Sequence, residues 1–154
     1  MNVPRFDGAH ILVIGDAMLD RYWHGDTRRV SAEAPIPVVD VNEIEDRMGG
    51  AANVALNIAT LGSRASLIAA VGLDEAGGIL KAKLESADIS HHLIESADFR
   101  TTTKLRMVSQ SQQLIRADFE DIVDIDGAAL APLLARTIDD IDIVVFSDYD
   151  KGVL

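Results

Sequence analysis

The chain has 154 residues, enough for one ordinary domain with a sizeable core. Its 25 acidic and 14 basic residues give a formal net charge of −11, which argues against nucleic acid or an anionic membrane as the main partner. The absence of cysteine excludes disulfides, thiolate metal sites and a cysteine nucleophile. The N-terminus shows no signal-peptide pattern and every apolar run is too short to span a bilayer, so we expect a cytoplasmic protein.

The chain alternates predicted strands with predicted helices. In order, we expect a strand at residues 10–16, a helix at 51–61, a strand at 65–71, a helix at 73–84, a short strand at 92–94, a helix at 125–135 and a strand at 141–146. Short apolar runs separated by helices are typical of a parallel sheet built from βαβ units. The sequence therefore predicts an α/β fold with a mainly parallel sheet flanked by helices.

Two segments interrupt this alternation. Residues 36–44 are extended and follow an aromatic, basic stretch at 21–29. Residues 101–119 favour β structure throughout, with a polar break at 109–112 that could form a hairpin turn. Both segments fit a small antiparallel sheet beside the main one, and the alternative is that they are ordinary edge strands.

A glycine pair, Gly49-Gly50, stands directly before a helical pattern that contains Asn53 and ends at Gly62. Two glycines let the backbone approach a ligand closely, and a helix start offers free N–H groups. This arrangement suits a polyol or a phosphate. It also suits a tight turn with close packing of helix on sheet, so both interpretations stand for the glycine pair alone.

The wider pattern resembles the first signature of the ribokinase-type sugar kinases, the phosphofructokinase-B family. Its constrained positions match Gly49, Gly50, Asn53, Ala55, Gly62 and Gly72. The resemblance implies a ribokinase-like fold in which a small β-sheet forms a lid over the sugar, here at about 21–47 and 99–119. Such lids commonly pair between subunits, so the resemblance also implies a homodimer.

Further segments are similar to one group within this family, the bacterial kinases of D-glycero-β-D-manno-heptose 7-phosphate. The matching segments are 15–23, 34–39, 103–106, 112–116 and 147–152. This resemblance implies phosphorylation of the sugar at O1 by ATP with Mg²⁺, giving the 1,7-bisphosphate for ADP-heptose and lipopolysaccharide core synthesis. The alternatives are a kinase for another sugar and a non-catalytic sugar-phosphate-binding or dimerisation module.

Candidate binding residues follow from the residue types and from this resemblance. Asp20 matches the family's aspartate that accepts sugar hydroxyls. Lys104 and Arg106 are two apart in a predicted strand and so face one side, as a phosphate clamp or a solvated basic stripe would. Lys151 follows a strand end, where ligands gather in open α/β sheets, although a plain surface lysine is the alternative. Together with the glycine pair and Asn53, these residues form the expected substrate site.

The resemblance is incomplete on the nucleotide side. The family's Gly-Ala-Gly-Asp motif, whose aspartate is the catalytic base, is absent. We therefore expect no catalytic residue and no metal ligand in this chain, a site for ATP and Mg²⁺ elsewhere, and no kinase activity from residues 1–154 alone. The expectation is an N-terminal sugar-binding half, present as a truncated product, a fragment or one piece of a split gene, with a possible C-terminal half as partner.

Overall fold

The computed structural model describes residues 7–154. Residues 1–6, part of the N-terminus for which the sequence predicts no signal peptide, lie outside the described residues. The main sheet is parallel, with strand order β5-β4-β1-β8. Its strands are β1 (His10–Gly15), β4 (Arg64–Gly72), β5 (Ser90–Ser96) and β8 (Ile143–Ser147). The parallel sheet expected from the apolar runs is confirmed.

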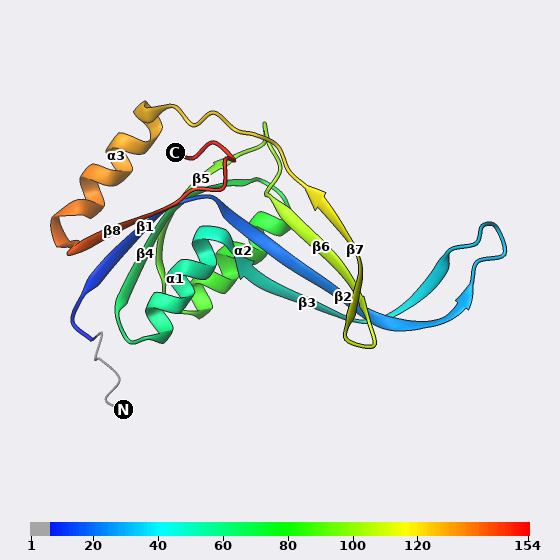
Figure 1. Cartoon of the computed structure of the whole chain (residues 1–154). Coiled ribbons are helices and arrows are strands. Elements are labelled where there is room, and N and C mark those ends of the chain that lie inside the picture. Colours follow the sequence, from blue (N-terminus) through cyan, green and yellow to red (C-terminus); the bar gives the residue numbers. More distant parts are fainter. Residues whose placement is uncertain (1–6) are drawn as a thin grey trace.

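Helices cover both faces of the main sheet (Figure 1). On one face, α1 (Gly50–Thr60) and α2 (Glu75–Ser86) enclose a core that includes Val13 and Leu67. On the other face, α3 (Gly127–Thr137) packs on Leu12 and Ile14, and a short 3-10 turn, η1 (Ile138–Asp140), follows it. Consecutive residues of β1 thus point into two different cores, because side chains alternate along a strand. Within residues 7–154, no helix is long and apolar enough to cross a membrane.

A second sheet stands beside the main one, with strand order β3-β2-β6-β7. It comprises β2 (Ala17–Val30), β3 (Pro37–Gly49), β6 (Thr103–Ser109) and β7 (Gln112–Phe119). The prediction of a purely antiparallel sheet is wrong, because the two central strands, β2 and β6, run parallel. Both strands leave the main domain in the same direction, and each then returns through its own hairpin. The β2–β3 hairpin extends well beyond β6 and β7 (Figure 1).

The other expected elements occur within a few residues of their predicted positions. The short strand expected at 92–94 is longer, at Ser90–Ser96, and the basic stretch 21–29 lies within β2. The predicted turn at 109–112 contains Gln110 and Ser111, both with positive φ, between β6 and β7.

The register gives the second sheet two chemically different faces, since residues paired across strands share a face. We call one the polar face; it includes Asp20, Tyr22, Arg47, Lys104, Arg106, Arg116 and Asp118. We call the other the apolar face; it includes Leu19, Trp23, Ile44, Leu105, Met107, Ile115 and Phe119.

Candidate functional site

Asp20 and Arg106 form an ion pair on the polar face. Their side chains are 23% and 17% exposed, so the pair is largely shielded from water. The guanidinium of Arg106 also lies 5.2 Å from the ring centroid of Tyr22, within the range of a cation–π contact. Among the described residues, only one oxygen of the Asp20 carboxylate has a hydrogen-bond partner. The second oxygen can therefore accept a hydrogen bond from a ligand hydroxyl.

The glycine pair sits where β3 ends and α1 begins, and each glycine has a steric reason. A β-carbon at Gly49 would lie 2.5 Å from Oδ2 of Asp20, so a side chain there would displace the carboxylate. Gly50 has a φ of +54°, and a β-carbon there would collide with the backbone oxygen of Asp16. That same oxygen accepts the N–H of Ala51 at 2.9 Å. The tight-turn interpretation of the pair is thus correct, and Gly49 also makes room for Asp20.

Asn53 and Asp20 line one pocket of about 490 Å³. The pocket lies between α1, the end of α2 and the β2–β3 edge of the second sheet, and Tyr22, Arg47 and Lys83 also line it. The guanidinium of Arg47 stands 4.5 Å above the Tyr22 ring centroid and pairs with Glu45. The sequence predicts Asn53 and Asp20 in one substrate site, and both residues line this pocket.

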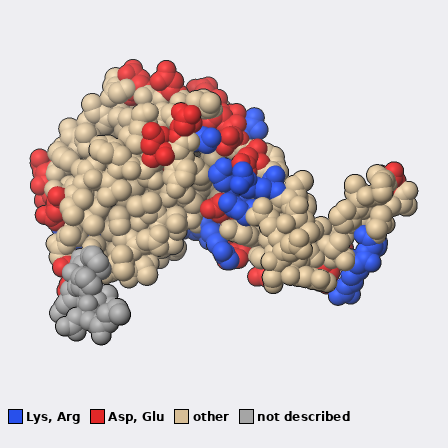
Figure 2. Space-filling model, viewed as in Figure 1, with Lys and Arg blue, Asp and Glu red and all other residues tan. Residues whose placement is uncertain are grey.

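Basic residues gather where the polar face meets the main domain (Figure 2). On the polar face, Asp118 accepts hydrogen bonds from Lys104 at 3.0 Å and from Arg116 at 2.9 Å. Burial raises the pKa of Asp118, but these two hydrogen bonds outweigh burial and leave the pKa below its usual value. Beyond β7, Glu120 lies 3.8 Å from Lys104 and 3.2 Å from Lys151.

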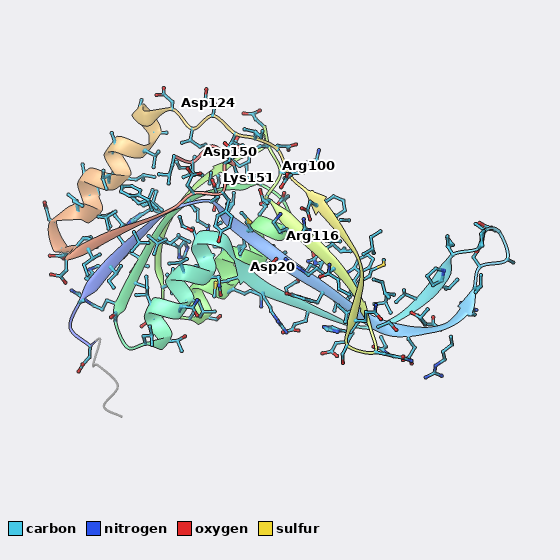
Figure 3. The ribbon with its side chains drawn as sticks, viewed as in Figure 1. Asp20, Arg100, Arg116, Asp124, Asp150 and Lys151 are labelled. Carbon is cyan, nitrogen blue, oxygen red and sulfur yellow. The ribbon has the colours of Figure 1, made fainter. Side chains whose placement is uncertain are left out.

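Lys104 and Arg106 therefore share a face, as their spacing predicts, but each is already paired with a carboxylate of the chain. Lys151 approaches the same region from the main domain (Figure 3). The structure thus brings together Asp20, Arg106 and Lys104 on the second sheet. Lys151 joins Lys104 through Glu120. Asn53 on α1 lines the same pocket as Asp20, and Gly49 at the end of β3 lies against the Asp20 carboxylate.

Asp16 places the loop that contains Lys151. Its carboxylate is 2% exposed and accepts the backbone N–H groups of Tyr149, Lys151 and Val153 at 2.8, 3.2 and 3.3 Å. Asp16 is not one of the substrate-binding residues that the sequence predicts. A buried carboxylate with several N–H partners fixes a loop strongly, because these hydrogen bonds are charge-assisted.

Sequence reasoning missed the carboxylates Asp118 and Glu120 and the cations Arg47 and Lys83. The alternation of Arg116, Asp118 and Glu120 could have indicated that these side chains share a face, and the pairing of Asp118 with Lys104 places that face beside the basic residues. No local pattern indicates Lys83, because it reaches the pocket from the last turn of α2.

The model of the pfkB family carbohydrate kinases matches residues 9–153. The chain belongs to this family. The fold agrees with that assignment, since a parallel sheet with helices on both faces and a small second sheet is the ribokinase-like architecture.

Curated relatives share about half of their aligned residues with this chain. The bifunctional protein HldE of Pseudomonas syringae pv. tomato is 52% identical over 154 residues, which are 100% of this chain and 32% of the relative. HldE of Chromohalobacter salexigens is 52% identical over 155 residues, covering 100% of the chain and 33% of the relative. The chain therefore spans about a third of the length of these relatives.

Solved structures show the same fold at low sequence identity. A carbohydrate kinase from Agrobacterium tumefaciens has a TM-score of 0.65 at 19% identity, covering 90% of this chain and 45% of that one. A possible 1-phosphofructokinase from Thermotoga maritima has a TM-score of 0.67 at 18% identity, covering 89% of this chain and 44% of that one.

Kinases of this family use ATP and Mg²⁺, but the residues of this chain do not fit a nucleotide site. The sequence has no Gly-Ala-Gly-Asp motif, and Gly77-Gly78 lies inside α2. In residues 7–154, no group of three His, Asp or Glu side chains could hold a metal ion.

Proposed function

We propose that this chain is the sugar-binding half of a kinase for D-glycero-D-manno-heptose 7-phosphate. The reaction transfers a phosphoryl group from ATP to O1 of the sugar and gives the 1,7-bisphosphate. The observation that supports this proposal best is the 50–52% identity to HldE over the whole chain, together with a pocket that joins Asp20 and Asn53. The second sheet is then the lid over the sugar, as in the family that the sequence resembles.

In this proposal, the protein positions the sugar and neutralises its charge, which is the main contribution of a protein to phosphoryl transfer. Asp20 accepts hydrogen bonds from sugar hydroxyls through its unpaired oxygen, and Asn53 offers both a donor and an acceptor. Lys104, Arg106 and Lys151 face the distal phosphate. The base and the residues that hold ATP and Mg²⁺ come from outside these residues, so the chain alone turns over no ATP.

Calorimetric titration of the purified chain with heptose 7-phosphate tests this proposal. Asp20→Asn keeps the shape of the side chain but removes its charge, and we expect binding to weaken by about 1.5–3 kcal/mol. Arg106→Ala should weaken binding by a similar amount, because it removes a cation and leaves Asp20 unpaired. Arg29→Ala, on the exposed end of the β2–β3 hairpin, is the matched control. Equal binding by the wild-type chain and Asp20→Asn would contradict the proposal.

The identity of the sugar is tested by competition. A kinase for another sugar would bind ribose or fructose 6-phosphate at least as tightly as heptose 7-phosphate in the same titration. A preference for heptose 7-phosphate over heptose of at least tenfold would support the role of the three cations, since one charge-assisted contact accounts for such a factor.

We also propose that the lid pairs with the lid of a second copy of the chain. The apolar face exposes large side chains that its own chain does not cover: Ile44 is 59% exposed, Ile115 55% and Phe119 44%. The Arg21–Asp46 ion pair lies on the same face, and large exposed apolar side chains beside it mark an interaction site. Self-complementary packing about a two-fold axis buries the same patch on both subunits.

A further inference from the structure

Two lysines from different parts of the fold converge on one carboxylate. Lys104 lies on β6 of the second sheet, and Lys151 lies in the loop after β8 of the main domain. Between them stands Glu120, whose two oxygens lie 3.8 Å from Nζ of Lys104 and 3.2 Å from Nζ of Lys151. We propose that Glu120 occupies an anion site, and that a phosphate group of the ligand displaces it and binds between the two lysines.

Lys104 and Lys151 together have more N–H donors than the Glu120 carboxylate can accept hydrogen bonds from. Each lysine ammonium has three N–H donors. Glu120 is the only ion-pair partner of Lys151 among the described residues, and Lys104 has Glu120 and Asp118. A single carboxylate therefore leaves several N–H groups for other acceptors. A phosphate has more oxygens and a higher charge at neutral pH than a carboxylate, so it can engage both ammonium groups more fully.

The position of Glu120 also allows its carboxylate to move away from the two lysines. It follows the last residue of β7, its side chain is 34% exposed, and within residues 7–154 the two lysines are its only side-chain partners. Asp118 differs, because Lys104 and Arg116 hold it from both sides at about the ideal hydrogen-bond distance. Glu120 is the more exposed partner in each pair, at 34% against 20% for each lysine, so its carboxylate can turn toward water and leave both ammonium groups to another anion.

If phosphate displaces Glu120, the group that connects the second sheet to the main domain changes when the ligand binds. Glu120 joins the second sheet to the loop of Lys151 when no ligand is bound, and a bound phosphate makes the same connection directly. The site lies next to Asp20, which pairs with Lys104 in the strand register. This inference rests on the proposed function, in which the ligand is a sugar phosphate.

Titration of the purified chain with inorganic phosphate at low ionic strength tests the displacement. Glu120→Gln keeps the shape and removes the competing charge, so we expect phosphate to bind about three- to tenfold more tightly than to the wild type. Adding Lys151→Met to Glu120→Gln should abolish that gain, because the second ammonium is gone. Thermal unfolding shows that each variant is folded before the titration.

Two control variants distinguish a local effect of Glu120 on phosphate affinity from a general effect of the protein's net charge. Glu43→Gln removes one negative charge from an exposed position on β3 and should leave phosphate affinity unchanged. Lys81→Met removes a lysine that pairs with Glu95 and should also leave it unchanged. The inference is overturned if Glu120→Gln binds phosphate no better than the wild type, or if Glu43→Gln gives the same gain. Failure of the proposed function looks different, since heptose 7-phosphate would then bind no more tightly than phosphate to every variant.

Discussion

The main sheet and the second sheet differ in how far their two faces are covered by the rest of the chain. Strands β1 and β4 are covered on both faces, and residues such as Leu12, Val13 and Leu67 are fully buried. The second sheet is covered on neither face to that extent. Its polar face is lined with ion pairs, and its apolar face leaves Ile44 and Ile115 in water.

This difference indicates where stability and binding reside. Burial of apolar area is the dominant favourable term in folding, so the free energy of unfolding should depend mainly on the main sheet. The ion pairs of the polar face are partly shielded, and the cost of removing such charges from water offsets much of their attraction, so these paired charges are better explained by binding than by stability. Variants that affect one sheet should therefore change a measurement that variants in the other leave unchanged.

The largest expected effect is on the core of the main sheet. Leu67→Ala removes a fully buried side chain of β4 and leaves a cavity, so we expect the free energy of unfolding to fall by about 2–5 kcal/mol. The matched control is Leu114→Ala on β7, where the side chain is 41% exposed. That variant should lose about 1 kcal/mol or less. Urea unfolding followed by circular dichroism measures both, and equal losses would remove the distinction between the two sheets.

The next effect concerns the loop that brings Lys151 to the second sheet. Asp16→Asn leaves one acceptor oxygen where three backbone N–H groups now converge, so we expect a loss of about 2–4 kcal/mol. Amide hydrogen exchange should speed up at Tyr149, Lys151 and Val153 more than in β1. Asp139→Asn, at an exposed position in η1, is the charge-matched control. Unchanged exchange at the three amides would show that Asp16 does not hold the loop.

The fold was more predictable from sequence than the site. Apolar runs at 10–16, 65–71 and 141–146 indicated the main sheet because buried parallel strands need continuous apolar residues. The parallel pairing of β2 with β6 was missed, since their pairing joins residues about 84 positions apart, such as Asp20 and Lys104, and no local pattern encodes it.

The sequence predicted those features of the site that follow from strand spacing or from the conformational freedom of glycine. Strand periodicity placed Lys104 and Arg106 on one face, and the glycine pair indicated a close backbone approach. The sequence did not predict which charged residues form ion pairs. The sequence shows that Arg106 is a cation, but only the fold shows that Asp20 neutralises it and that Glu120 stands between two lysines.

A smaller effect is expected where α2 meets the start of the second sheet. Asp74 caps α2 through the N–H of Gly77 at 2.8 Å and also accepts the N–H of Thr101 at 2.8 Å. Burial raises the pKa of Asp74, but the hydrogen bonds from Gly77 and Thr101 outweigh it and lower the pKa below its usual value.

A lowered carboxyl pKa stabilises the folded state above the ordinary pKa of about 3.9, and this contribution is lost as the pH falls through the lowered value. We therefore expect Asp74→Ala to cost about 1 kcal/mol at pH 7 and less as the pH falls through the lowered pKa of Asp74. Thermal melts from pH 7 to pH 2 measure the difference. A constant difference between the two proteins across this range would contradict the assignment.

The smallest expected effect on stability is also the sharpest test of the apolar face. Ile115 on β7 is 55% exposed, so Ile115→Lys should change the free energy of unfolding by less than about 0.5 kcal/mol. In a dimer that buries this face, however, the same lysine would be forced into an apolar interface without a partner, which is strongly unfavourable. Sedimentation velocity at micromolar concentration should therefore show a dimer for the wild type and a monomer for Ile115→Lys.

Ile122→Lys is the control, because Ile122 is 79% exposed in the loop beyond β7 and the substitution adds the same charge. A wild-type monomer, or a dimer that survives Ile115→Lys, would show that the apolar face of the second sheet does not pair with a second copy.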